Sequence, residues 1–179
     1  MDSEDRAAES IVPEDKDWTF VIESGCAQCG FTPEFDPAAT GDRLRTAARR
    51  WLPVLARADA RNRPNPGVWS PVEYGCHVRD TCRIFRGRLE LMRTLENPEF
   101  ANWDQDVTAV ADRYAEQDPG MVAGQLVAEA EATAEAFDAV SGSDWERPGR
   151  RSNGSVFTIR TFAVYFLHDV EHHLHDVAG

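Results

Sequence analysis

The chain has 179 residues, 42% of them hydrophobic, and its 19 Lys+Arg against 31 Asp+Glu give a formal net charge of −12. This length predicts one domain of ordinary size, and the acidic balance argues against a nucleic-acid partner because it repels phosphate backbones. No apolar run approaches the roughly 18 residues of a membrane span, and the acidic start lacks the cationic region of a signal peptide. We therefore expect a cytoplasmic protein without a membrane partner, in which the four cysteines are thiols or metal ligands and not disulfides.

The N-terminal part divides into two segments. Residues 1–16 are polar and acidic, which predicts a disordered tail. Residues 17–39 form an extension in which 18–22 is a short β-like run. The extension also holds Cys26-Ala-Gln-Cys29, where the small residues and the tight spacing predict a turn that aims both sulfurs the same way.

Apolar residues at helical spacing predict four helices, at about 40–58, 71–94, 118–140 and 158–177. The clearest helix start is at Ser70, a natural N-cap that is followed by proline and then by the glutamate of a capping box. Residues 97–117 form a connector without a strong period, and 143–157 are expected to be an irregular loop or a short hairpin. Residues 40–179 are thus predicted to be an all-α four-helix bundle.

The last expected helix contains four of the five histidines. It is apolar nearly all round, which predicts burial, and His168, His172 and His175 fall on one face. The i, i+4 pair has the spacing of a metal clamp, and His77 on the second helix is the candidate third ligand. Asp80 is a candidate partner that orients His77, and His175 a candidate proton shuttle. The alternatives are a hydrogen-bonded core histidine at 77 and a solvated helix end for the others.

The spacing of Cys26 and Cys29 leaves three interpretations open: a reduced thiol pair, a redox pair, or half of a zinc site. A zinc ion would need two more ligands. Either Cys76 or Cys82 could supply one, but not both, because a helix separates them by about 9 Å along its axis and about 120° around it. A histidine of the last helix, such as His173, is the other candidate. We expect this pair to be separate from the histidine site.

A polar stretch of the connector surrounds one tryptophan, and it is a candidate substrate loop formed by Asn102, Trp103, Asp104 and Gln105. A long connector in a bundle is often a binding loop. The alternative is a packing loop whose tryptophan is held in the core. The two arginines at 150–151 either bind an anionic substrate or form an exposed basic turn.

Two motifs resemble those of the DinB/YfiT-like superfamily: Trp69-Ser-Pro-Val-Glu-x3-His77, and His168-x3-His172 on the last helix. The resemblance covers residues 40–177. It implies a four-helix bundle with a divalent metal site of three ligands. The superfamily includes transferases that depend on low-molecular-weight thiols and a mycothiol-dependent maleylpyruvate isomerase.

The resulting functional prediction is a metal-dependent enzyme, specifically a thiol-dependent S-transferase or isomerase acting on a small molecule. The expected cofactors are a divalent ion, zinc first, with nickel, iron or manganese also suited to imidazole, and a low-molecular-weight thiol cosubstrate. The ion would lower the pKa of a thiol or a water in its open position. The alternatives are a non-catalytic metal-binding or stress-response protein, and a bundle with purely structural histidines. A homodimer is left open.

Overall fold

The computed structural model describes residues 11–13 and 15–179, so most of the expected tail at 1–16 lies outside the described residues. Four long helices dominate the fold, as predicted: α2 Thr40–Leu55, α3 Pro71–Thr94, α5 Pro119–Asp138 and α6 Ile159–Asp176. Helix α2 ends at Leu55, earlier than expected and shortly after the helix-breaking Pro53. The all-α four-helix bundle is confirmed.

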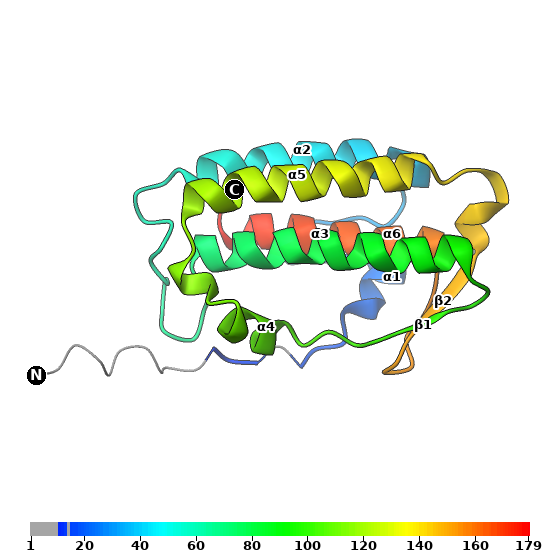
Figure 1. Ribbon diagram of the computed structural model, residues 1–179, viewed down its shortest axis with the longest axis horizontal. Coiled ribbons are helices and arrows are strands. Elements are labelled where there is room, and N and C mark those ends of the chain that lie inside the picture. The colour runs from blue at the N-terminus through cyan, green and yellow to red at the C-terminus, as the bar shows by residue number, and fades with distance from the viewer. Residues whose placement is uncertain (1–10, 14) are drawn as a thin grey trace, which may run out of the picture.

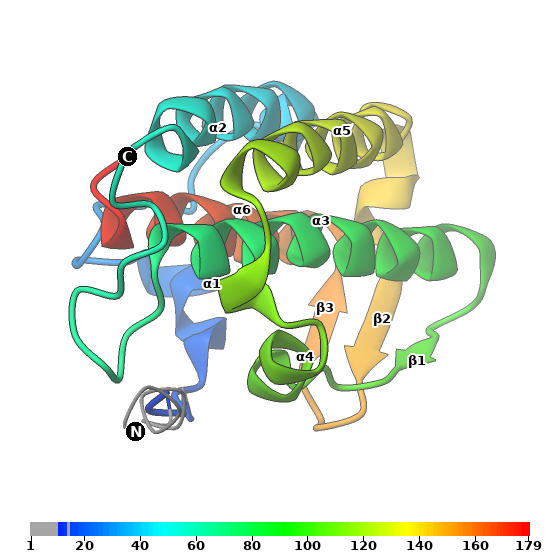
Figure 2. The same cartoon turned by 60° about the vertical axis from the view of Figure 1, so that its left-hand side comes forward.

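The helices lie in two layers, with α2 and α5 in one and α3 and α6 in the other (Figure 1). Short elements cover the outer side of the α3/α6 layer, as both ribbon views show (Figure 2). Helix α6 is therefore covered on both sides, which agrees with the burial predicted from its apolar sequence. Phe166, Leu167 and Val170 in this helix are 0% exposed.

The start of α3 positions the first half of the site. Ser70 accepts a hydrogen bond from the backbone N–H of Glu73, whose carboxylate accepts one from the backbone N–H of Ser70 at 2.8 Å. The predicted capping box is thus present, with Pro71 at the first helical position. The guanidinium of Arg63 also donates to Glu73 and holds its carboxylate in place.

Replacing Ser70 by alanine is expected to lower the free energy of unfolding by about 0.5–2 kcal/mol, because loss of the cap leaves a backbone donor of α3 unsatisfied. Ser70 is only 1% exposed, so water cannot replace the hydroxyl easily. Urea unfolding followed by circular dichroism measures the change. Ser70→Thr keeps the hydroxyl and is the control. Equal midpoints for the alanine variant and the wild type would show that the cap is redundant.

The predicted strand at 18–22 is wrong: the segment is helical, as η1 Trp18–Phe20 followed by α1 Val21–Ser24. Asp17 caps the turn by accepting a hydrogen bond from the N–H of Thr19 at 2.9 Å. The segment packs against α6, and this tertiary contact together with the cap outweighs the β-propensity of its aromatic and branched residues.

The connectors contain more regular structure than the sequence indicates, in the form of η2 Pro37–Ala39, β1 Glu99–Phe100, α4 Gln105–Ala111, η3 Tyr114–Glu116, η4 Gly142–Glu146, β2 Pro148–Arg151 and β3 Val156–Thr158. Strands β2 and β3 are antiparallel, so the hairpin expected as one alternative within 143–157 is present. Strand β1 pairs in parallel with β2. In Figure 2 this small sheet lies below α3, and β1 leads into the connector before α4.

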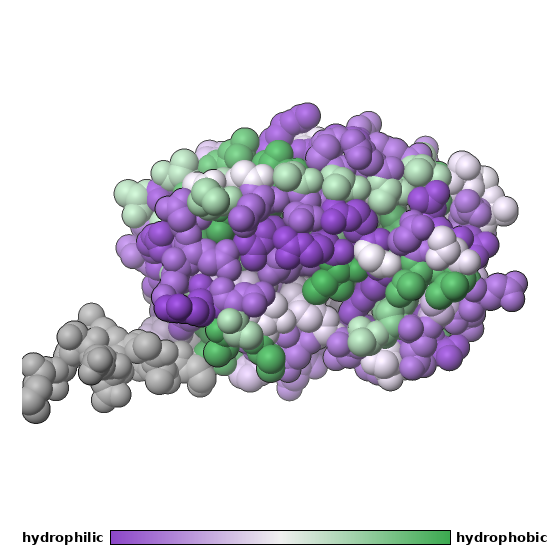
Figure 3. All heavy atoms as spheres, in the orientation of Figure 1, coloured by the Kyte–Doolittle hydropathy of each residue, from purple (hydrophilic) through white to green (hydrophobic). Residues whose placement is uncertain are grey.

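The surface reflects the acidic, polar composition. The face seen in Figure 3 is mostly hydrophilic, with hydrophobic residues in small separate areas. In the described part of the chain, no helix combines the length and apolarity that crossing a bilayer requires.

Candidate metal centre

Helix α6 carries two pairs of potential ligands at i, i+4 spacing. One pair is His168 and His172, and the other is Asp169 and His173, one residue further along. Successive residues of an α-helix differ by about 100° in direction, so the two pairs face different neighbours. The structure accordingly assembles two separate groups of ligands around this helix.

The first group consists of His77 from α3 with Asp169 and His173 from α6. Each residue offers one ligand atom, and these atoms all lie within 4.8 Å of one another. The Nε2 atom of His77 is 3.3 Å from Oδ2 of Asp169, and Nε2 of His173 is 3.6 Å from Oδ1 of the same carboxylate. Two imidazoles thus approach one carboxylate from two different helices of the bundle.

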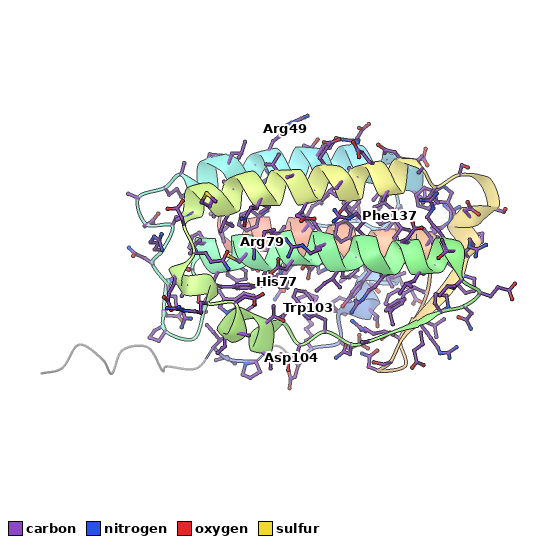
Figure 4. All side chains as sticks on the ribbon, viewed as in Figure 1. Arg49, His77, Arg79, Trp103, Asp104 and Phe137 are labelled. Carbon is purple, nitrogen blue, oxygen red and sulfur yellow. The ribbon has the colours of Figure 1, made fainter. Side chains whose placement is uncertain are left out.

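Neighbouring side chains orient these ligands. Asp176 contacts Nδ1 of His173 at 2.9 Å, which leaves Nε2 of this ring directed at Asp169. The indole of Trp103 stacks on His77 with ring centroids 5.2 Å apart and an interplanar angle of 3°. Figure 4 shows His77 extending from α3 toward Trp103. A carboxylate behind a histidine is the arrangement that fixes imidazole tautomers in metal sites.

The electrostatics of the group favour a cation. Burial lowers the pKa of His77 in spite of nearby Asp169, so this imidazole is neutral. Burial would raise the pKa of Asp169, but His173 and His77 hold it well below its usual value. Burial would also lower the pKa of His173, yet the carboxylates of Asp169 and Asp176 raise it to about 9. Without a metal, a proton on His173 balances the carboxylates, and a divalent ion can replace that proton.

The second group consists of Cys26, Cys29, His168 and His172, whose ligand atoms also lie within 4.8 Å of one another. The sulfur of Cys26 is 3.6 Å from Nδ1 of His172. The rings of His168 and His172 have centroids 5.0 Å apart. The two cysteines are therefore close together, as the turn predicted. The expected separation of this pair from the histidine site is wrong, because the cysteines share their group with His168 and His172.

The structure does not assemble the expected group of His77, His168 and His172. His168 and His172 face the N-terminal extension, whereas His77 meets Asp169 and His173. The physical reason is the 100° step between neighbouring helix positions, which turns the 169/173 pair toward α3 and the 168/172 pair toward the cysteines. His173, considered above as a ligand for the cysteines, belongs to the first group instead.

Asp80, expected to orient His77, has other partners. It accepts hydrogen bonds from Arg79 and from the hydroxyl of Tyr114, and no hydrogen bond joins it to His77 among the described residues. His175, expected as a proton shuttle, is exposed. It lies outside both ligand groups formed by the described residues.

Cys76 and Cys82 also lie outside both groups. Both are buried free thiols within α3. Burial raises the pKa of Cys76 to about 12, so this thiol is protonated at neutral pH.

A cleft of about 900 Å³ opens beside the first group, between α6, the N-terminal extension and the connector before α4. Asp169 and His173 line it, and so do all four residues of the expected substrate loop: Asn102, Trp103, Asp104 and Gln105. A smaller cavity of about 70 Å³ shares Trp103 and Asp169 with the cleft, and its lining includes His77, Arg88 and Arg151. The expected loop residues thus lie next to the ligands.

Comparison with known proteins agrees with this architecture. The sequence model of the DinB superfamily matches residues 32–177, which is most of the chain. The chain belongs to the DinB superfamily. Among solved structures, it is similar to YfiT from Bacillus subtilis, described as a probable metal-dependent hydrolase with an unusual four-helix bundle topology. That match has a TM-score of 0.66 and 14% identity, and covers 79% of this chain and 83% of YfiT. No curated protein matches the chain in sequence.

The two ligand groups differ in their relation to the DinB segment. His77, Asp169 and His173 all lie within residues 32–177, on two helices of the bundle. Cys26 and Cys29 precede that segment, so the second group joins the DinB bundle to an extension outside the family match.

Sequence reasoning missed Asp169 and His173 as members of the first group, and Asp176 as the partner of His173. A signal was present, because Asp169-x3-His173 has the same spacing as His168-x3-His172 and carboxylates are also metal ligands. Spacing alone cannot choose between the two pairs, since both occupy consecutive positions on the same helix.

Proposed function

We propose that the protein is a divalent-metal-dependent enzyme whose ion is held by His77, Asp169 and His173. The observation that carries the proposal is the convergence of two imidazoles and a carboxylate, from two helices, beside a cleft large enough for a small substrate. Three protein ligands leave coordination positions open, and open positions distinguish catalytic zinc sites from structural ones.

The residues present fit such an ion. Oδ2 of Asp169 is buried without a well-formed hydrogen bond among the described residues, although Nε2 of His77 lies 3.3 Å from it. A buried carboxylate oxygen without such a bond is costly, and a bound cation would satisfy it. Two histidines and an aspartate suit zinc best, although the same donors also bind iron, manganese and nickel.

The reaction proposed is attack on a small electrophile by a thiol or a water. A divalent ion, when bound, lowers the pKa of a thiol or water that reaches it and so supplies the nucleophile at neutral pH. Asp169 and His173 hold their ligand atoms at the edge of the cleft, and Asp176 keeps His173 in the required tautomer. Trp103 covers His77 and limits the access of bulk water to the ligands.

The positions of Arg88 and Arg151 indicate that the substrate is negatively charged. Both line the small cavity next to His77 and Asp169, and neither forms an ion pair within the described residues. Arg88 is 7% exposed, and burial together with the charge of Arg151 lowers its pKa to about 10. A buried guanidinium without a carboxylate favours binding of a carboxylate or another small anion.

The leading activity is a thiol-dependent S-transfer or isomerisation. A cleft of about 900 Å³ can hold a low-molecular-weight thiol together with a small anionic electrophile. Hydrolysis, in which water replaces the thiol, is the second candidate, and the similarity to the probable hydrolase YfiT favours it. A protein that binds metal without turnover is the non-enzymatic alternative.

An assay of the purified full-length protein distinguishes these candidates. The electrophile is a small unsaturated carboxylate, presented with a low-molecular-weight thiol or with water alone. Consumption only with thiol supports the transferase or isomerase, and consumption without thiol supports the hydrolase. A metal-loaded protein inactive toward a panel of such electrophiles and of simple esters would contradict the enzymatic proposal.

Arg88→Met is expected to raise KM for the anionic electrophile about 10- to 100-fold, because a charged hydrogen bond contributes about 1.5–3 kcal/mol. Steady-state kinetics measure the change. Arg86→Met is the matched control, since Arg86 is ion-paired with Glu129 and does not line the small cavity. An unchanged KM in the Arg88 variant would remove this residue from substrate binding.

A further inference from the structure

We propose that Cys26, Cys29, His168 and His172 form a second, closed zinc site that fastens the N-terminal extension to α6. Two thiols and two imidazoles form a tetrahedral donor set that zinc takes in structural sites. The four ligand atoms lie within 4.8 Å of one another, and none of the four residues belongs to the first group. Zinc binding at this second site does not depend on whether the protein has the proposed enzymatic function.

The spacing of the ligand atoms fits a zinc tetrahedron. With Zn–S of about 2.3 Å and Zn–N of about 2.0–2.1 Å, a sulfur and a nitrogen at neighbouring corners lie about 3.6 Å apart. The sulfur of Cys26 and Nδ1 of His172 are separated by 3.6 Å. His168 has a buried Nε2 without a hydrogen-bond partner among the described residues. A buried ring nitrogen of this kind is an available ligand.

The backbone of the turn holds the two sulfurs ready. The N–H of Cys26 donates to the carbonyl of Phe31 at 2.9 Å, and the N–H of Gly30 donates to the carbonyl of Cys26 at 2.9 Å. Gly30 has a φ of 76°, a left-handed conformation that glycine adopts without strain. Burial raises the pKa of the Cys29 thiol to about 11, and a backbone hydrogen bond from Phe31 opposes this effect only in part. Zinc binding would release the thiol proton.

Aromatic rings pack against both histidines of the second group, which also line the cleft. The ring of Trp18 lies 5.2 Å from that of His168 and 4.8 Å from that of His172, between centroids. The ring of Phe31 lies 5.4 Å from that of His168. Four protein ligands leave no open position, so the ion has a structural role and not a catalytic one.

The second group lies next to the first, and Asp176 contacts both. Oδ1 of Asp176 lies 3.6 Å from Nε2 of His172, and Oδ2 contacts Nδ1 of His173. One carboxylate thus supports a histidine of each group. Trp18 and Gln28 from the extension line the cleft, so zinc at the second site would fix one wall of the cleft beside the first.

Cobalt substitution of the full-length protein tests the proposal directly. We expect one equivalent of Co²⁺ per chain to give thiolate-to-cobalt charge-transfer absorption and the intense visible bands of tetrahedral cobalt. Cys26→Ala together with Cys29→Ala should abolish the charge-transfer band and remove about one zinc per chain from the protein as purified. Cys76→Ala, which removes a buried thiol outside the site, is the matched control and should keep both.

The variant pair His77→Ala and His173→Ala separates this proposal from the proposed function. It should remove the ion of the first group and leave the charge-transfer band intact. X-ray absorption at the zinc edge of the wild type should show a sulfur shell at about 2.3 Å beside nitrogens at about 2.0–2.1 Å, and in the His77→Ala/His173→Ala variant the average should be two sulfurs and two nitrogens per zinc. A zinc shell without sulfur, or cobalt-loaded protein without the charge-transfer band, would overturn the proposal.

Discussion

Replacing Asp169 by asparagine is expected to weaken divalent-metal binding at the first group by at least about 100-fold and to abolish metal-dependent turnover. The variant removes the negative charge that both His77 and His173 approach. Loss of a residue that only orients a ligand already costs about 10- to 100-fold in affinity, so loss of the charged ligand itself should cost more. Manganese titration is the appropriate measurement, because Mn²⁺ prefers carboxylate and water to thiolate and reports little on the cysteine group.

Two further variants calibrate this result. Asp176→Asn alters only the partner of His173 and should weaken binding about 10- to 100-fold. Glu171→Gln removes a carboxylate from the same helix, where it pairs with Arg43 at 2.8 Å and belongs to neither ligand group, and should leave affinity unchanged. Wild-type manganese affinity in the Asp169 variant would exclude this carboxylate as a ligand.

Replacing Phe166 by alanine is expected to lower the free energy of unfolding by about 3–5 kcal/mol. Phe166 is 0% exposed and stacks on Phe85 of α3 and Phe137 of α5, with centroid distances of 5.1 and 5.7 Å. The truncation would leave a cavity where three bundle helices meet, and the rigid helices around it can close only part of that space. Urea unfolding followed by circular dichroism measures the loss.

The matched control is Phe20→Ala, which removes the same side chain from a position that is 41% exposed. Its cost should stay within about 1 kcal/mol, because little apolar area returns to water. Similar midpoints for the two variants would show that Phe166 does not join the helices as its packing indicates. The expected difference between the variants depends on burial alone and does not require a metal.

Local patterns in the sequence were sufficient to predict the four-helix bundle. Apolar residues at helical spacing indicated the four long helices, and the Ser70 capping box placed the start of α3 correctly. These features depend on neighbours within about one helical turn, so they can be read from the chain directly. The strand predicted at 18–22 was wrong because the segment packs on α6, and local propensity carries no information about such a tertiary contact.

The sequence by itself determined that α6 is a buried helix with histidines at the i, i+4 spacing of a metal site, and that Cys26 and Cys29 share a turn. Only the tertiary structure decided which ligands meet. His168/His172 and Asp169/His173 have identical spacing, and they differ only by the 100° that separates consecutive helix positions. This difference in direction decides the ligand groups because α3 places His77 on one side of α6 and the N-terminal extension places the cysteines on another. Two pairs that are one residue apart on a helix therefore face different neighbours. The sequence pattern of the helix contains no information about where those neighbours lie.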